Sequence, residues 1–241
     1  MSRKSNKPTK LDFSGKKLSS LVGQKGLEGA KSSLKIKLAN NLFEEVPVEE
    51  LSQADVLALD LSKNCIRGLS ANIATLKSLE VLELSSNRIT DLGQELLSLT
   101  KLRVLNLSSN QLTVVPSVIS ELVSLESLNL AKNLLHLIPT SLTLLTNLQD
   151  LDVIGNPLVS PPGDVIQKGT SAIINFLKTQ SCTIGATVNT FMHLGRPPYI
   201  AEWIKPVPDS PTINRSQPKT LFDVRASLSL CLLTFLRKYS I

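Results

Sequence analysis

The chain has 241 residues, of which 42% are hydrophobic and only 4% aromatic, and its formal net charge is +6. The charge sits at the ends: residues 1–10 carry four basic and no acidic side chains, residues 180–241 seven basic and three acidic, and residues 11–179 fifteen basic and seventeen acidic. The central segment therefore has a net charge of −2 and lacks the basic, aromatic-bearing surface of nucleic-acid binders, which argues against nucleic acid as its partner.

The N-terminal segment 1–10 is polar and basic and has no apolar run behind it. We expect a short disordered arm, neither a secretory signal nor a membrane anchor, and a cytoplasmic protein. Next, Leu11, Phe13 and Leu18 fit the strand half of the repeat described below, with Lys16 at its asparagine position. Because terminal repeats are commonly atypical, this stretch predicts a degenerate first coil.

A sequence repeat occupies the middle of the chain, and its clearest copy is Leu102–Leu112, which reads LxxLxLxxNxL. In an extended strand Leu105 and Leu107 point to one face and Asn106 to the other. The asparagine of the motif follows the strand, where its amide can hydrogen-bond backbone groups of the turn. It recurs every 23 residues, at Asn41, Asn64, Asn87, Asn110, Asn133 and Asn156.

The second half of each unit repeats too. Apolar residues recur there with steps of four and then three, for example Ile138, Leu142 and Leu145, which predicts a turn of helix or 3₁₀ structure. The two halves together predict an α/β fold, a right-handed leucine-rich repeat solenoid of about seven coils of 23 residues with a parallel sheet on its concave face. We assign this domain to residues 11–179.

The repeat ends after Asn156, and an amphipathic segment follows. Two prolines, Pro161 and Pro162, stand where a helix start tolerates them. The apolar residues after them fall on one side of a helix from about Gly163 to Leu177: Val165, Ile166, Ala172, Ile173, Phe176 and Leu177. The position beside the last coil predicts a C-terminal helical cap, and a helix that binds a partner is the alternative.

Residues 180–241 are rich in proline and match no repeat, so we expect a disordered tail. Its uncharged stretch Ala226–Leu236 is too short to cross a bilayer, which needs roughly 20 residues. With basic neighbours, residues 221–241 could instead lie weakly on a membrane surface. A peripheral membrane protein is therefore the alternative function.

Catalytic and metal-binding patterns are lacking in the sequence. His136 and His193 are far apart, and Cys65, Cys182 and Cys231 show no CxxC spacing, so we expect free thiols in a reducing compartment. Phosphate-loop and hydrolase motifs do not occur. We expect no enzyme, no cofactor and no metal site.

The exposed strand face is the candidate binding site. Alternation within the strands places on it a partner-binding strip made of Lys35, Lys37, Asp60, Glu83, Asn106, Asn129, Asp150 and Asp152. A merely solvated charged surface is the alternative. Seven strands at ~4.8 Å and a width of ~12 Å offer only ~350 Å², less than the ~800 Å² per partner of a standard interface. Rim residues such as Arg88, Gln111 and His136 must then contribute, or binding is weak.

The repeats and cap resemble a known family. The resemblance rests on the 23-residue units, on the Val-Pro and Ile-Pro pairs at Val46, Val115 and Ile138, and on the NPLxxPPxxVxxxGTxAIxxFL segment at 156–177. These features resemble the intracellular leucine-rich repeat family, including the plant Ras-group-related proteins and the C-terminal repeats of leucine-rich repeat-containing protein 40. The resemblance implies a non-enzymatic adaptor or scaffold in signalling that binds an unidentified protein. We expect it to be a monomer.

Overall fold

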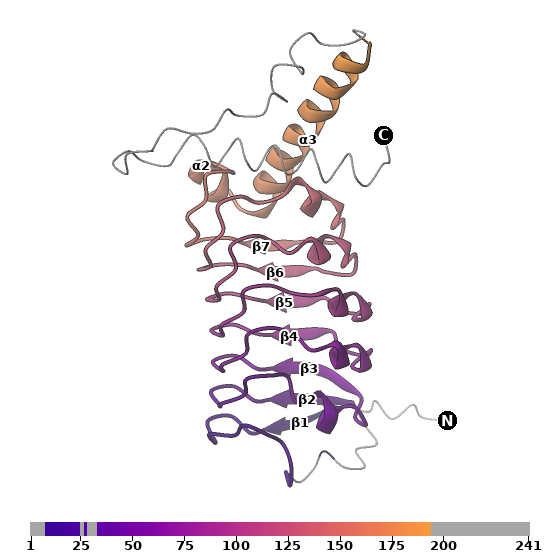
Figure 1. Cartoon of the computed structure of the whole chain (residues 1–241), viewed down its shortest axis with the longest axis vertical. Coiled ribbons are helices and arrows are strands. Elements are labelled where there is room, and N and C mark those ends of the chain that lie inside the picture. Colours follow the sequence, from indigo (N-terminus) through magenta and orange to yellow (C-terminus); the bar gives the residue numbers. More distant parts are fainter. Residues whose placement is uncertain (1–7, 25–26, 28–32, 194–241) are drawn as a thin grey trace, which may run out of the picture. The chain divides into compact units, whose positions relative to one another are not determined.

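The structure, a computed structural model, describes residues 8–24, 27 and 33–193. Within this part, seven parallel strands follow one another in chain order and form one sheet (Figure 1). The strands are β1 (Thr9–Asp12), β2 (Leu34–Lys37), β3 (Val56–Asp60), β4 (Val81–Glu83), β5 (Val104–Asn106), β6 (Ser127–Asn129) and β7 (Asp150–Asp152). The predicted α/β solenoid of about seven coils is confirmed. The rest of the predicted tail, from residue 194, and most of the arm lie outside the described residues.

The strand register agrees with the predicted repeat. Leu82 pairs with Leu105 and Leu105 with Leu128, each 23 residues further along the chain. The degenerate first coil is also confirmed, because Leu11 of β1 pairs with Ile36 of β2. Strand β1 begins at Thr9, inside the arm that we expected over residues 1–10.

Short helices form the opposite side of the coils. Four are 3₁₀ helices, as the apolar spacing predicted: η1 (Ala71–Thr75), η2 (Gln94–Ser98), η3 (Ser117–Glu121) and η4 (Thr140–Leu144). The second coil instead carries one α-helical turn, α1 (Val48–Leu51), whose two end residues are buried. The coils that begin with β2 to β6 thus each have a strand side and a helical side.

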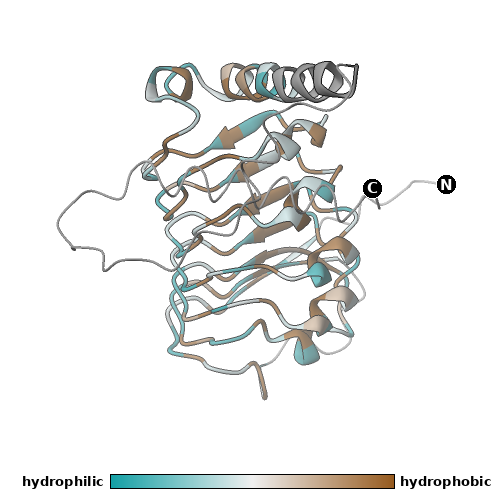
Figure 2. Cartoon of the chain, turned by 45° about the horizontal axis from the view of Figure 1, so that its top comes forward, coloured by the Kyte–Doolittle hydropathy of each residue, from teal (hydrophilic) through white to brown (hydrophobic). Residues whose placement is uncertain are grey.

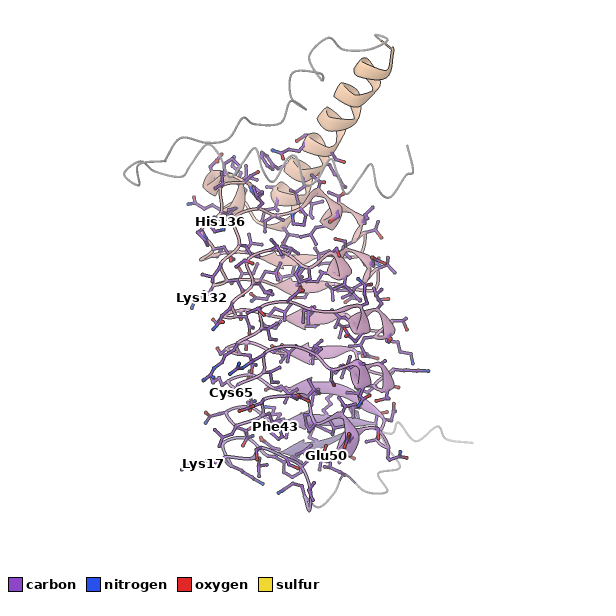
Figure 3. The ribbon with its side chains drawn as sticks, viewed as in Figure 1. Lys17, Phe43, Glu50, Cys65, Lys132 and His136 are labelled. Carbon is purple, nitrogen blue, oxygen red and sulfur yellow. The ribbon has the colours of Figure 1, made fainter. Side chains whose placement is uncertain are left out.

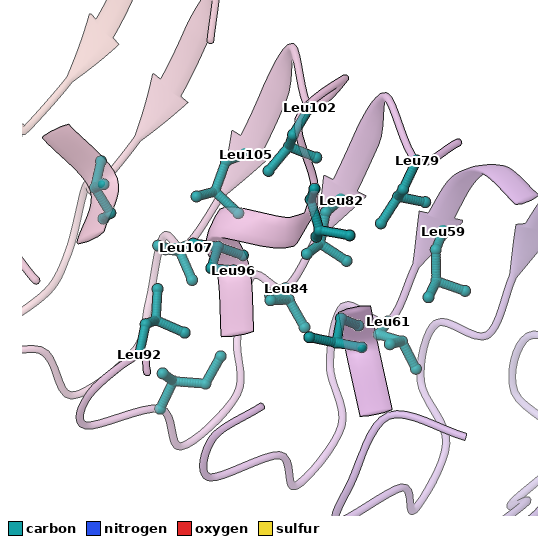
Figure 4. Close-up of a cluster of buried hydrophobic side chains, with 14 of the residues drawn as sticks. Leu59, Leu61, Leu79, Leu82, Leu84, Leu92, Leu96, Leu102, Leu105 and Leu107 are labelled. Atoms are coloured by element: carbon teal, nitrogen blue, oxygen red, sulfur yellow. The ribbon is translucent and has the colours of Figure 1, made fainter. Parts of the chain in front are cut away.

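Leucines stacked in layers fill the space between these two sides (Figure 4). Within one coil, Leu82 and Leu84 point inward from the strand side and Leu96 from the helical side, and all three are fully buried. Equivalent residues of the next coil lie above them, so the hydrophobic colour recurs from strand to strand in Figure 2. Because each layer contacts mainly its neighbours, stability is distributed along the repeat.

The motif asparagines form an asparagine ladder. Asn110 is buried; its Nδ2 donates to the carbonyl oxygens of Leu107 and Leu84 at 3.0 Å, and its Oδ1 accepts from the N–H of Ile89 at 3.0 Å. The predicted bond to the turn is therefore confirmed, and the ladder also reaches the preceding coil. Lys16 takes the corresponding place in the first coil, where its backbone N–H donates to Asn41 Oδ1 at 3.1 Å.

The residue before each ladder asparagine adopts a left-handed conformation. Lys132, for example, has a φ of 55°, and its N–H donates to the carbonyl oxygen of Ile154 in the next coil at 2.8 Å. These residues lie along one margin of the coils, the turn edge, where Figure 3 labels Lys17, Lys132 and His136. The bond to the next coil holds a conformation that costs a non-glycine residue roughly 1 kcal/mol.

The C-terminal cap consists of two helices. They are α2 (Gly163–Ile166) and α3 (Thr170–His193), and Gly169 separates them with a φ of 84°. Ile173 and Leu177 are buried against the core, and Thr170 Oγ1 accepts the N–H of Leu151 in the last strand at 2.8 Å. The cap is confirmed, but the single helix expected from Gly163 to Leu177 is wrong. Helix α3 continues beyond residue 179, where we expected the domain to end.

Candidate partner-binding surface

The outward residues of the seven strands form two parallel rows, which together we call the strip. One row contains Lys10, Lys35, Ala58, Val81, Val104, Ser127 and Asp150, and the other contains Asp12, Lys37, Asp60, Glu83, Asn106, Asn129 and Asp152. All eight predicted site residues lie in these rows. Lys35, Lys37 and Asp150 are exposed, and the other five are partly buried by their neighbours. The structure therefore brings the predicted residues together on one surface.

The second row also has a local structural role that the sequence analysis missed. Asp60 Oδ1 accepts the N–H of Ser62 at 3.0 Å, and Asn106 Oδ1 accepts that of Ser108 at 3.0 Å. The same bond to the residue two positions later forms at Asp12, Asn129 and Asp152. Asx turns of this kind satisfy backbone N–H groups where the strand ends. Polar residues in this row are thus partly explained by the backbone.

Acidic side chains of the second row interact with their neighbours along the strip. Burial raises the pKa of Glu83 above its ordinary value, a hydrogen bond from Asn106 opposes the rise, and the nearby charge of Asp60 adds to it. Asn129 Nδ2 lies 3.5 Å from Asp152 Oδ2, a long contact. A cation placed here would relieve the repulsion between Asp60 and Glu83.

The strip charges are not neutralised by ion pairs. The described part of the chain contains two ion pairs of 4.0 Å or less, Arg103–Glu126 at 2.7 Å and Lys168–Asp164 at 4.0 Å. Neither involves a residue of the strip. Charged groups of both signs are therefore available on this surface to a binding partner.

Comparison with known proteins supports the leucine-rich repeat assignment. A sequence profile described as Leucine rich repeat matches residues 77–135. Among solved structures, a leucine-rich repeat protein of Leptospira interrogans is 26% identical, with a TM-score of 0.51 over 62% of this chain and 43% of that chain. This chain is built of leucine-rich repeats. It spans less than half the length of the Leptospira protein, and its place in the intracellular branch of the family stays a prediction.

Two plant structures also resemble this leucine-rich repeat protein. The ectodomain of the receptor kinase SOBIR1 from Arabidopsis thaliana is 32% identical, with a TM-score of 0.41 over 47% of this chain and 64% of that one. The plant peptide hormone receptor RGFR1, solved in complex with RGF2, is 25% identical, with a TM-score of 0.46 over 63% of this chain and 23% of that one. Curated protein sequences gave no match.

A second exposed surface of the leucine-rich repeats lies on the turn edge of the last coils. We call it the turn-edge patch and define it by Val114, Leu134, Leu137 and Val159, whose exposed fractions range from 46% to 65%. Sequence analysis missed it, although Val114 and Leu137 are 23 residues apart and each precedes an apolar residue and a proline. The predicted rim residues Arg88, Gln111 and His136 are exposed.

Several features outside the strip bear on other possible functions. A surface depression of about 560 Å³ beside α1 has Glu44, Glu45, Glu49 and Glu50 in its wall. Among the residues that the structure describes, no group of three or more histidines, cysteines or acids could hold a metal ion. No helix in the same residues is both long enough and apolar enough to cross a membrane. Cys65 is a free thiol.

Proposed function

We propose that this leucine-rich repeat protein is a non-enzymatic adaptor or scaffold in the cytoplasm, which binds another protein through the strip. One observation carries this proposal: charged residues of both signs lie in register on strands β1 to β4 and β7, without ion pairs among themselves. A leucine-rich repeat array is typically a protein-interaction module, so an unpaired surface of this kind suits a protein partner. Work in signalling and a cytoplasmic location follow from the resemblance to the intracellular family.

The size of the surface supports a moderate affinity. With ~350 Å², the strip is smaller than the ~800 Å² that each partner buries in a standard interface. The turn-edge patch offers exposed apolar side chains. In the strip, the apolar residues are the partly exposed Ala58, Val81 and Val104 in its middle. A partner that contacts both surfaces would gain hydrophobic area from the patch and orientation from the strip charges.

Affinity capture from cell extract tests the proposal. Full-length protein should retain a partner that is lost when Asp60→Lys and Glu83→Lys are combined, since the introduced lysines then repel cations on the partner. The matched control combines Glu49→Lys with Glu121→Lys, because these exposed acids lie on the helical side, in α1 and η3. Glu126 is unsuitable as a control, because it accepts two hydrogen bonds from Arg103, at 2.8 and 2.7 Å.

Circular dichroism must show that both double variants are folded, and the strip variant should melt at a somewhat lower temperature, because Asp60→Lys removes the acceptor of the Ser62 N–H. If the strip variant unfolds, Asp60→Asn with Glu83→Gln removes the same two charges while keeping polar side chains of equal size. Partners kept by the strip variants and lost by the helical-side control would refute the proposal.

The membrane alternative also stays a prediction, since residues 221–241 lie outside the described residues. Liposome flotation of the full chain and of a chain that ends at residue 219 would test it. Flotation that depends on residues 220–241 would favour it.

A further inference from the structure

We propose that the strip binds an extended peptide segment of mixed charge, with an acidic residue over Lys35 and Lys37 and a basic residue over Asp150 and Asp152. This inference rests on the proposed function and names the chemistry of the partner. It concerns which kind of segment fits, and in which register along the sheet.

The first row of the strip changes character along the solenoid. It begins with Lys10 and Lys35, continues with the aliphatic residues Ala58, Val81 and Val104, and ends at Asp150. The aliphatic residues are partly exposed, so small apolar side chains of a ligand could cover them. Positive charge, apolar surface, the polar Ser127 and negative charge thus follow each other along this row.

The net charge of the strip has the same polarity. Strands β1 and β2 contribute three lysines and one aspartate, a net +2 from Lys10, Lys35, Lys37 and Asp12. Strands β3 to β7 contribute four acids and no base, a net −4 from Asp60, Glu83, Asp150 and Asp152. A ligand with uniform charge would be repelled at one end, whereas a ligand with opposite charges at its two ends is attracted at both.

The groups at the two ends are accessible. Lys35, Lys37 and Asp150 are exposed. Asp150 Oδ2 accepts one hydrogen bond from Ser127 at 3.1 Å, which leaves the other oxygen of this carboxylate for a ligand. Between the ends, Asn106 and Asn129 carry amides that can donate to carbonyl oxygens of a peptide backbone.

The dimensions favour an extended segment over a folded surface. Five strand steps separate Lys35 from Asp150, which is ~24 Å at ~4.8 Å per step. An extended peptide covers this distance in about seven residues at ~3.3 Å each. The acidic and basic residues of the ligand should therefore be about seven positions apart, and a segment of this width needs little more than the ~350 Å² of the strip.

Fluorescence polarisation with labelled octapeptides tests the inference on the full-length protein. The probes share a Val-Ala-Val-Ser-rich middle and blocked ends, and they carry Asp and Arg, Arg and Arg, or Asp and Asp at positions 1 and 8. The mixed peptide is used in both chain directions. We expect the better mixed peptide to bind about five- to tenfold more tightly than either uniform peptide at low salt, with a smaller ratio at high salt.

Charge reversal at one end should change the preference. Lys35→Glu with Lys37→Glu makes both ends acidic, so the Arg–Arg peptide should become the tightest ligand. Asp150→Lys with Asp152→Lys makes both ends basic, so the Asp–Asp peptide should become the tightest. Lys63→Glu with Lys132→Glu is the control, since both exposed lysines lie on the turn edge, and the preference for mixed charge should remain.

The inference is overturned if uniform peptides bind the unmodified protein as tightly as mixed ones, if no octapeptide binds, or if reversal leaves the ranking unchanged. Should capture of a cellular partner still depend on Asp60 and Glu83 in that case, the proposed function would stand and only the peptide chemistry would be wrong.

Discussion

Asn110 and Leu84 belong to successive coils, and the side-chain Nδ2 of the first donates to the main-chain oxygen of the second at 3.0 Å. The corresponding bond joins Asn87 to Leu61 at 2.9 Å and Asn133 to Leu107 at 2.9 Å. Because these amides are buried, water cannot replace the bonds that they make. The ladder therefore couples each coil to the one before it, in addition to the leucine layers.

Replacement of Asn110 by alanine should be strongly destabilising. It removes the acceptor of the Ile89 N–H and a donor to two carbonyl oxygens, and each unpaired buried group costs ~1–3 kcal/mol. We expect the free energy of unfolding to fall by at least ~2 kcal/mol in chemical denaturation. Gln111→Ala, at the exposed neighbouring position, should change it by less than ~0.5 kcal/mol. Equal stability of the two variants would contradict the role of the ladder.

Asn129 differs from the ladder residues, because it lies at the end of strand β6 and belongs to the outward row. The sequence predicts it on the exposed strand face, and its Oδ1 accepts the N–H of Ala131 at 2.9 Å. Asn129→Ala should therefore cost about as much as an exposed capping bond, ~0.5–1.5 kcal/mol, and less than Asn110→Ala.

The cap should be needed for the solubility of the repeats. Leu177→Ala removes a buried side chain of α3 and should lower the free energy of unfolding by ~2–4 kcal/mol. Lys178→Ala, which is exposed, should have little effect. Deletion of residues 157–241 should cause aggregation, because it uncovers the apolar layer of the last coil. A soluble truncated protein that melts like the full chain would rule out the cap.

Glu83 should make stability depend on pH. Burial raises its pKa above 4.5, Asn106 opposes this rise and Asp60 adds to it. The folded protein then binds the proton more tightly than the unfolded chain, so the contribution of Glu83 to stability declines as pH rises from below 4.5 through the raised pKa. The thermal stability of Glu83→Gln relative to the unmodified protein should therefore increase between about pH 4 and pH 7. Melting curves recorded at intervals of about one pH unit would measure this change.

Asp60→Asn is the companion variant for this measurement. It removes the neighbouring negative charge, so the gain from Glu83→Gln should be smaller in its background. A relative loss of stability for Glu83→Gln as pH rises would show that the environment of Glu83 is different from the one described.

The positions of the strip residues were predictable because two periods determine them. A 23-residue period places Asp60, Glu83 and Asn106 at equivalent positions of their coils, and the alternation within a strand turns all three outward. The Asx turns at the same residues depend on the local backbone at the end of each strand. The pattern of apolar residues contains no information about those bonds.

Other features depend on contacts between coils. A ladder amide reaches the preceding coil only because successive coils are as close as neighbouring strands of a sheet. The sequence of a single repeat contains no information about this distance. The break between α2 and α3 comes from the left-handed conformation of Gly169. The apolar periodicity continues through this residue, so the pattern alone predicted one helix. The turn-edge patch was missed because its residues repeat over the last coils alone, for example at Val114 and Leu137.

Site-specific photo-crosslinking tests most directly whether the strand face is the binding surface. A benzophenone side chain is introduced at Val104, in the middle of the strip, or at Glu121, on the helical side, and each protein is irradiated in cell extract. We expect a crosslinked partner from position 104 that disappears when Asp60→Lys and Glu83→Lys are added, and none from position 121. A partner crosslinked from position 121 and not from position 104 would place the interface on the helical side and contradict the account.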